Sequence, residues 1–279
     1  MKRWQWIFFL LALCLLLTSC HSASAAPPLR IYFFDVGQGD AVLLRTDEGD
    51  ILLDAGPEDA QDLLCLRLEQ LGVTELTLAI FTHPDEDHIG GADAVLTRIP
   101  TREVWTNGAP LTGEAAGRML DVAKQMGVPV RTARTGKVVR FGQTVISVLA
   151  PLQDVSGAGN EDSIVLKILC GEIGAIFTGD AGIEQEVGLV LTYGESVLDC
   201  ELYKVGHHGS NTSSGIAFLQ SVTPAYAVIS CGAANRYGHP YGEVLGRLED
   251  VGATILRTDL LGEIVFETDG ETLTYVEHP

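Results

Sequence analysis

Two histidines and three acidic residues lie within six consecutive positions of the sequence, in the stretch THPDEDHIGG over residues 82–91. His83, Asp85 and Asp87 alternate, so an extended loop would direct them to one side. A tight turn would aim Asp87 and His88 at a second point. This arrangement suits two cations about 3.5–4 Å apart, as in two-metal hydrolases. A solvated acidic loop is the alternative interpretation.

Other histidines and acids occur in similar settings along the chain. Five histidines lie beside expected strand ends in glycine-rich stretches: His83, His88, His207, His208 and His239. Asp54 and Asp180 also follow apolar runs, in LLDAG and FTGDA. Histidines and carboxylates gathered at strand ends are typical of metal and catalytic sites. The set as a whole therefore favours such a site over unrelated structural histidines.

Many strands are predicted to carry these residues. Apolar and alternating patterns predict strands over residues 30–36, 42–45, 51–56, 76–83, 103–106, 138–141, 144–149, 163–169, 175–178, 202–205, 225–230, 253–256, 262–267 and 272–276. Helical periodicity is expected over residues 59–72, 89–99, 112–126, 183–193, 216–221 and 242–251. This order favours a single α/β domain over residues 30–279, built as an αββα sandwich with two sheets face to face and helices outside. A conventional doubly wound sheet is the competing architecture.

The first residues predict export. Two basic residues precede an apolar run over residues 4–17, which is typical of a signal peptide and short for a membrane span of about 20 residues. The stretch LTSC, residues 17–20, resembles a bacterial lipobox, which implies a signal peptide over residues 1–20, a lipid on Cys20 and a tether over residues 21–29. We therefore expect a lipoprotein on the outer face of the cell membrane. A secreted protein cut after SASA and an uncleaved anchor are the alternatives.

The charge balance limits the partners. The formal net charge is −19, which disfavours non-specific binding to nucleic acid, since that binding depends on Lys and Arg. A modest basic concentration is present at Arg131, Arg134, Lys137 and Arg140. The sequence identifies no partner protein.

The cysteines beyond the signal are expected to be buried free thiols. They are Cys65, Cys170, Cys200 and Cys231. They lack CxxC spacing and lie in apolar segments, which argues against a zinc cluster. Disulfides stay open as an alternative in an exported chain, because sequence alone cannot pair them.

Seven motifs in order resemble the metallo-β-lactamase superfamily, and more narrowly the extracellular metallo-β-lactamase-like domain of the ComEC competence proteins. They are FDVGQGDA (34–41), LLDAG (52–56), THPDEDHIGG (82–91), NEDS (160–163), FTGDA (177–181), KVGHHGS (204–210) and NRYGHP (235–240). THPDEDHIGG is similar to the HxHxDH signature of the superfamily, with Asp85 at the second histidine, a form usual in the ComEC branch. The polytopic channel of full ComEC has no counterpart here, so a free-standing exported form is expected.

The resemblance implies ligands for two divalent ions: Asp87, His88 and His207 for one, His83 and Asp85 for the other, and Asp180 as the bridge. Which of His207 and His208 is the ligand stays open. The first site is richer in oxygen than in many members, because Asn160, Asp162 and Ser163 stand where those members have a further histidine. Mn²⁺ therefore suits the centre as well as Zn²⁺. Occupancy by one ion is the alternative.

Supporting and catalytic roles also follow from the resemblance. Residues expected to orient the ligands or line the site are Asp54, Gln38, Asp40, Asn160 and Ser163, with turn formation alone as the alternative for Gln38 and Asp40. Residues expected to act in catalysis are Asp87, His208, Tyr237 and His239. Tyr237 and His239 would contact the scissile phosphate or protonate the leaving group. His208 would support His207 or touch the substrate.

The implied reaction is hydrolysis of a phosphodiester by metal-activated water, with DNA outside the membrane as the first substrate to consider. One alternative is a phosphodiester of the cell wall, such as phosphocholine on teichoic acid, or a small phosphoester. Another is a binding lipoprotein without catalysis. The ligand pattern departs from that of the lactam-cleaving members, which argues against β-lactamase activity.

Overall fold

The structure is a computed structural model that describes residues 26–153, 155 and 159–277. The expected signal peptide, with Cys20, and most of the expected tether lie outside the described residues. The first strand begins at Leu29. Among the described helices, none is long and apolar enough to cross a membrane.

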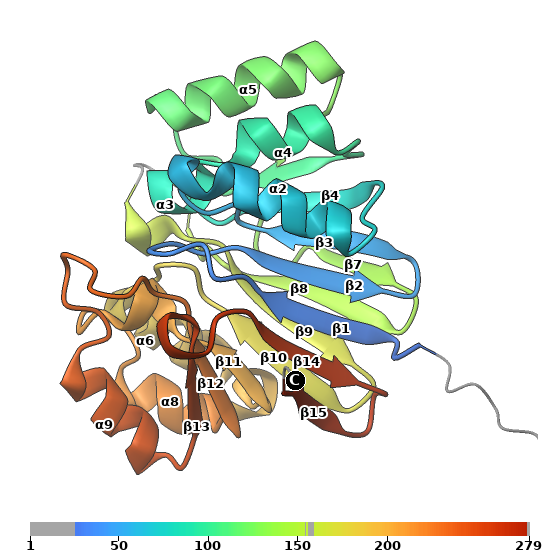
Figure 1. Ribbon diagram of the computed structural model, residues 1–279. Helices are drawn as coiled ribbons and strands as arrows, with labels where there is room; N and C mark the ends of the chain where they lie inside the picture. The colour runs from blue at the N-terminus through green and yellow to red at the C-terminus, as the bar shows by residue number, and fades with distance from the viewer. Residues whose placement is uncertain (1–25, 154, 156–158, 278–279) are drawn as a thin grey trace, which may run out of the picture.

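Two mixed sheets lie face to face at the centre of the molecule (Figure 1). The first contains β1 (Leu29–Phe33), β2 (Val42–Thr46), β3 (Gly49–Leu53), β4 (Leu76–Phe81), β5 (Val104–Thr106), β6 (Val130–Thr132), β14 (Ile264–Thr268) and β15 (Leu273–Val276), in the order β15-β14-β1-β2-β3-β4-β5-β6. The second contains β7 (Val138–Phe141), β8 (Thr144–Ala150), β9 (Val165–Cys170), β10 (Ile173–Phe177), β11 (Leu202–Lys204), β12 (Tyr226–Ile229) and β13 (Thr254–Arg257), in the order β13-β12-β11-β10-β9-β8-β7.

Helices cover the outer face of each sheet (Figure 1). The first sheet carries α2 (Gln61–Gln70), α3 (Glu86–Ile89), α4 (Ala92–Arg98) and α5 (Glu114–Met126). The second carries α6 (Ile183–Tyr193), α7 (Glu195–Leu198), α8 (Ile216–Val222) and α9 (Gly242–Asp250). The remaining short helices are α10 (Thr258–Leu261) and the 3-10 helices η1 (Glu58–Ala60), η2 (Asn160–Asp162) and η3 (Gly206–Gly209).

Strand β1 shows why the sequence forms layers. Ile31 and Phe33 point into the core between the sheets, whereas Tyr32 and Phe34 point into the core under the helices. A strand buried on both faces has a continuous apolar run, because successive side chains alternate between faces. Between the sheets, the Phe33 ring stacks on Phe177 with 5.8 Å between centroids. This packing joins the two sheets into one domain.

The αββα prediction is confirmed, and the doubly wound alternative is wrong because the strands divide between two sheets. Each sheet has a parallel part, β3-β4-β5-β6 in the first and β10-β11-β12-β13 in the second. Parallel strands end at the same edge of their sheet, and loops at that edge build sites in α/β folds. The segments that follow β4, β10 and β11 contain the candidate ligands, and the segment that follows β3 contains the supporting residue Asp54.

Each predicted strand and helix has a counterpart, with boundaries shifted by a few residues. The helix expected over residues 89–99 is instead divided between α3 and α4 at Gly90 and Gly91. A Cβ at Gly90 would lie 2.5 Å from the backbone nitrogen of Glu58, so the chain packs there too closely for any larger residue. Strand β6 was not expected, because three exposed or half-buried residues at a sheet edge carry little hydrophobic pattern.

The four cysteines within the described residues are buried and free. This confirms the expectation of free thiols. Burial raises the pKa of the Cys200 thiol to about 12, so that thiol is neutral at physiological pH.

Candidate metal centre

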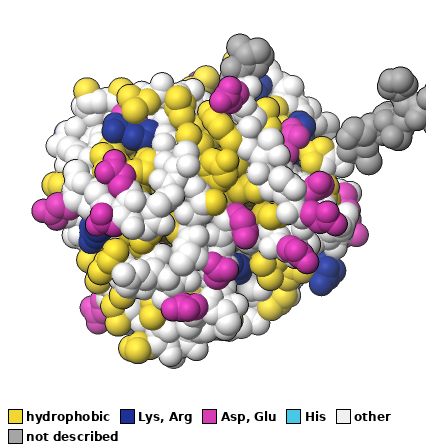
Figure 2. All heavy atoms as spheres, turned by 90° about the horizontal axis from the view of Figure 1, so that it is seen from below, with side chains coloured by type: hydrophobic (Ala, Val, Ile, Leu, Met, Phe, Trp, Pro, Cys, Tyr) yellow, Lys and Arg dark blue, Asp and Glu magenta, His cyan; other side chains and the backbone are white. Residues whose placement is uncertain are grey.

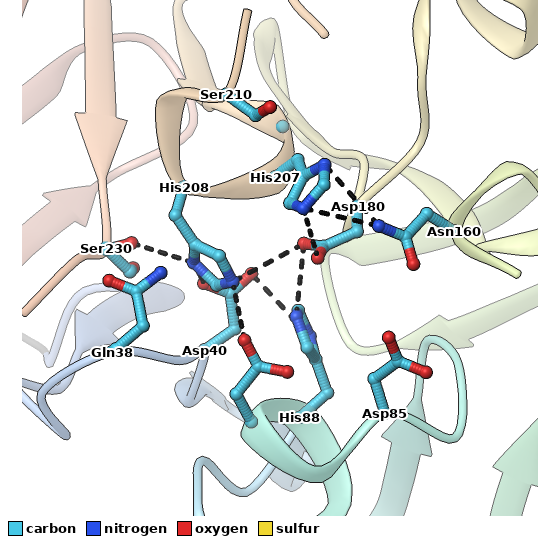
Figure 3. Close-up of polar contacts among 12 residues, drawn as sticks. Gln38, Asp40, Asp85, His88, Asn160, Asp180, His207, His208, Ser210 and Ser230 are labelled. Atoms are coloured by element: carbon cyan, nitrogen blue, oxygen red, sulfur yellow. Dashed lines mark hydrogen bonds and ion pairs between the residues drawn. The ribbon is translucent and has the colours of Figure 1, made fainter. Parts of the chain in front are cut away.

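The centre is organised around the buried carboxylate of Asp180, three residues beyond the end of β10. Its Oδ1 lies 3.1 Å from His88 Nε2 and 3.6 Å from His208 Nε2. Its Oδ2 lies 3.8 Å from His83 Nε2 and 3.6 Å from His207 Nε2. Figure 3 shows the carboxylate between the rings of His88, His207 and His208. Each oxygen faces a separate pair of histidines, which is the position of a bridging carboxylate.

Beside Oδ1, a four-residue cluster gathers potential ligand atoms. Asp87, His88, Asp180 and His208 each offer one atom, and these atoms lie within 4.8 Å of one another. The Asp87 carboxylate approaches His208, with 3.2 Å between Oδ2 and Nε2. Two imidazole nitrogens and two carboxylates form a donor set that suits a divalent transition-metal ion.

Beside Oδ2, a more open group faces solvent. His83 Nε2 lies 3.7 Å from Asp85 Oδ2, and Asn160 Nδ2 lies 3.3 Å from His207 Nε2. His207 is partly exposed, whereas His83 is buried. Asp85 and Asn160 thus lie on this side of Asp180.

The structure differs from the expected partition of the two adjacent histidines. His208, rather than His207, lies with Asp87 and His88. Both histidines have left-handed backbone angles, with φ of 48° and 53°, so the turn sends their rings in different directions. His208 Nδ1 lies 2.9 Å from the Ser230 carbonyl oxygen, which holds this ring in the buried cluster.

Asp54 orients the histidines from behind. Its Oδ2 accepts hydrogen bonds from His88 Nδ1 at 2.8 Å and from the Thr82 hydroxyl at 2.7 Å. With its own proton directed to Asp54, the Thr82 oxygen can accept the Nδ1 proton of His83, 3.1 Å away. In both His83 and His88, Nδ1 is thus the hydrogen-bond donor on the side away from the centre, and Nε2 faces Asp180. Carboxylate support of this kind fixes the tautomer of metal-binding histidines.

The residues fit divalent cations by a second criterion. Of the described buried atoms that lack a hydrogen-bond partner, four belong to the Asp180 carboxylate and the histidines that face it: Asp180 Oδ1 and the Nε2 atoms of His83, His88 and His208. Buried polar atoms without a partner are rare and call for an explanation such as a bound ion. Cations on both sides of Asp180 would satisfy all four atoms.

Buried carboxylates and histidines at the centre shift one another's pKa values. Burial alone would raise the pKa of Asp180, but His88 and His208 hold it well below its ordinary value. Burial would lower the pKa of His208, but Asp180 and Asp40 outweigh burial and raise it to about 10. Before a metal ion binds, protons on the histidines therefore compensate the negative charge of the carboxylates. A cation must displace these protons, so the affinity for metal falls as pH falls.

The other expected supporting residues lie around this cluster. Asp40 is buried, and its Oδ1 lies 3.3 Å from His208 Nδ1. The Ser163 hydroxyl oxygen accepts the Asp180 backbone N–H at 3.2 Å. Gln38 Oε1 accepts the Gly232 backbone N–H at 3.2 Å, and so ties the first sheet's GQGD turn to the segment after β12.

A cleft of about 730 Å³ opens beside Asp85 and Asp87. Tyr237, which is 46% exposed, lines its wall. The Tyr237 ring stacks on His239 with 5.6 Å between centroids, and the His239 ring is 5.6 Å from that of His207. The structure therefore brings both expected catalytic residues of the NRYGHP stretch to the mouth of the centre.

Three basic residues of the site were not anticipated. Lys204 is buried beneath the centre, and Arg118 and Arg236 line the cleft. Lys204 and Arg236 lie inside the KVGHHGS and NRYGHP motifs. Their place in these motifs could therefore have indicated that they belong to the site. Arg118 lies on α5, and only the folded chain shows that α5 reaches the cleft.

Comparison with known proteins agrees with this geometry. Residues 34–233 match the family described as the metallo-beta-lactamase superfamily, and the chain belongs to that superfamily. Among solved structures, CmlA, a diiron beta-hydroxylase from Streptomyces venezuelae, shares the fold with a TM-score of 0.56 and 12% identity, over 87% of this chain and 55% of that one. At this identity the likeness concerns the fold alone.

The ComEC-like resemblance is confirmed by curated relatives. ComE operon protein 3 of Bacillus subtilis is 28% identical, over 90% of this chain and 34% of the relative. Competence protein ComA of Neisseria gonorrhoeae is 35% identical, over 84% of this chain and 31% of the relative. The chain thus spans about a third of the length of these proteins.

Replacing the bridging carboxylate should abolish stabilisation by metal. An ion that binds only the folded chain adds about 2.7 kcal/mol at a hundredfold excess over Kd, or roughly 5–10 °C in Tm for a chain of this size. We expect this rise when Mn²⁺ or Zn²⁺ is added to the wild type and none for Asp180→Ala, measured by thermal unfolding. Asp121→Ala, on the exposed side of α5, is the matched control. An equal rise in the Asp180 variant would contradict the bridging role.

Proposed function

We propose that the protein is an exported, metal-dependent phosphodiesterase, and that it acts as a nuclease on DNA outside the cell membrane. The observation that carries the proposal is the placement of two donor sets on the two oxygens of Asp180, next to an open cleft that Asp85 and Asp87 line. Two-metal centres of this kind hydrolyse phosphoesters. The name of one relative, competence protein ComA, refers to competence, a process that handles DNA, which supports that substrate.

The ligands proposed for one ion are Asp87, His88 and His208, and for the other His83, Asp85 and His207, with Asp180 shared. Divalent cations there would supply positive charge to the phosphoryl oxygens and lower the pKa of water. The chain's own task is to hold the diester over Asp180 with its leaving group toward the open side of the cleft.

Tyr237 and His239 are suited to different parts of that task. Burial, together with His208 and His207, lowers the pKa of His239 to about 4. His239 is therefore neutral at pH 7, and its low pKa suits it to a hydrogen bond with the substrate rather than to protonation of the leaving group. The Tyr237 oxygen accepts a hydrogen bond from Arg236 at 2.7 Å, which leaves the phenolic proton free for a phosphate oxygen.

The cleft is acidic, and this constrains how a polyanion binds. Its lining includes the carboxylates Glu58, Asp59, Asp85, Glu86, Asp87 and Glu114. Acidic side chains are also spread over the face shown in Figure 2. Arg118 is engaged by Glu58 at 2.8 Å and Asp93 at 3.4 Å. Arg236 instead contacts the ring and hydroxyl of Tyr237, and we assign to Arg236 the contact with the diester.

The acidity also favours a second candidate substrate. A cell-wall diester with a cationic head group, such as phosphocholine, would be attracted by the same carboxylates that repel a polyanion. Tyr237 offers an aromatic ring on which such a cation could rest. A substrate comparison decides between the two candidates.

Loss of Asp87 should remove turnover without unfolding the chain. We expect the wild type with Mn²⁺ or Zn²⁺ to cleave single- or double-stranded DNA as well as bis(p-nitrophenyl) phosphate. Asp87→Ala should lose at least about a hundredfold in rate, as for removal of one charged catalytic group, with an unchanged circular dichroism spectrum. Cleavage of the small diester without DNA would favour the cell-wall candidate. Undiminished activity of purified Asp87→Ala would contradict the proposal.

Arg236→Gln should weaken substrate binding. Removing one phosphate contact raises KM for DNA, by roughly tenfold at low salt, and reduces the dependence of KM on salt. We expect kcat to change by less than about threefold, because a contact made equally in ground and transition states affects KM. Arg102→Gln, which loses an exposed pair with Glu75 outside the lining of the cleft, is the control. A fall in kcat with unchanged KM would contradict this role.

We also propose that a lipid on Cys20 holds the protein at the membrane, with a secreted form as the alternative. The support is the lipobox-like stretch LTSC. Cys20→Ala should move the protein out of the membrane fraction or leave an unprocessed precursor. Identical processing and fractionation of the variant and the wild type would refute the anchor.

A further inference from the structure

A lysine is buried directly behind the candidate ligands. Lys204 is the last residue of β11 and is 1% exposed. Its ammonium lies 2.8 Å from Asp40 Oδ2 and donates to the Val205 carbonyl at 2.8 Å. Burying an ammonium is unfavourable unless a partner compensates its charge. Asp40 is that partner, and it is itself buried.

Asp40 connects this ion pair to the centre. Its backbone N–H donates to the Asp87 carbonyl at 3.1 Å, and its own carbonyl accepts the Gly56 N–H at 2.8 Å. Its Oδ1 lies 3.3 Å from Nδ1 of His208. The preceding turn approaches closely, because a Cβ on Gly39 would lie 2.4 Å from the Asp87 carbonyl oxygen. The carboxylate is thus fixed on the outward side of a ligand ring.

The ammonium group of Lys204 already occupies the place beside Asp40. Asp40, Asp54 and His88 offer atoms within 4.8 Å of one another, a spacing that could hold a metal ion. However, His88 Nδ1 is hydrogen-bonded to Asp54, and Asp40 is paired with Lys204. The ammonium therefore stands where a further cation would otherwise be attracted.

The charges around the centre support a balancing role. The nearby carboxylates are those of Asp40, Asp54, Asp85, Asp87 and Asp180. When these five carboxylates are ionised and the histidines are neutral, the positive charge of Lys204 cancels one of the five negative charges. Four negative charges then remain. Two divalent cations neutralise four negative charges. Without the ammonium, the same carboxylates would attract cations more strongly.

We propose that Lys204 is a positioning residue that balances the charge of Asp40 and thereby sets the affinity of the centre for divalent ions. The inference rests on the metal centre of the proposed function and assigns a role to a residue outside its ligand set. Its consequence is that the two members of the pair affect metal affinity in opposite directions. A merely structural pair would weaken metal binding whichever member is removed.

The test measures Mn²⁺ affinity by isothermal titration calorimetry at pH 7 for Lys204→Met, Asp40→Asn and the double variant. Removing a unit charge close to divalent ions changes affinity by about tenfold or more. We expect Lys204→Met to bind Mn²⁺ more tightly by that factor, Asp40→Asn more weakly, and the double variant to lie within about threefold of the wild type, since both charges are removed together. Urea unfolding without metal should show both single variants destabilised and the double variant partly restored.

Lys167→Met is the matched control. Lys167 is also a buried lysine of the described chain, and it donates to the Asp199 carbonyl before the start of β11, at the end of that strand away from Asp180. It should leave Mn²⁺ affinity unchanged. Weaker binding by both Lys204→Met and Asp40→Asn, or a Lys204→Met affinity equal to that of the control, would overturn the inference while the metal centre stands. A wild type that binds no Mn²⁺ would overturn the centre itself.

Discussion

A single buried carboxylate, that of Asp180, faces two different donor sets with its two oxygens, and the fold is arranged around this contact. The first sheet supplies His83 and His88 from the segment after β4. The second supplies Asp180 after β10 and the two histidines of η3 after β11. Neither sheet alone holds the full set. The face-to-face packing of the sheets is therefore what creates the site, because it brings the carboxyl ends of two parallel strand groups together.

Strained backbone conformations direct several of these side chains toward Asp180. Asp54, His207 and His208 have φ values of 55°, 48° and 53°, in the left-handed region that costs a non-glycine residue about 1–2 kcal/mol. Such conformations persist where surrounding contacts determine them, and they concentrate at functional sites. Here the contacts are the hydrogen bonds from Thr82 and His88 to Asp54 and from His208 to the chain after β12.

Much of this could be predicted from the sequence, and the remainder depends on contacts that no local pattern encodes. Continuous apolar runs predicted the buried strands, and the motif order predicted the layers and the residues that gather. The division of roles between His207 and His208 was not predictable, because backbone angles at adjacent positions decide where each ring points. The motif places Lys204 near the ligands, but its pairing with Asp40 was not predictable, because the pair forms only when the GQGD turn packs against the end of β11. Arg118 reaches the cleft only through the packing of α5.

The central claim is that Asp180 lies between two divalent ions, one on each side. Anomalous diffraction from crystals of the protein loaded with Mn²⁺ tests this claim most directly. The account predicts two anomalous peaks about 3.5–4 Å apart, one beside Asp87, His88 and His208 and one beside His83 and His207. A single peak away from Asp180, or no peak within bonding distance of the histidine Nε2 atoms, would contradict it.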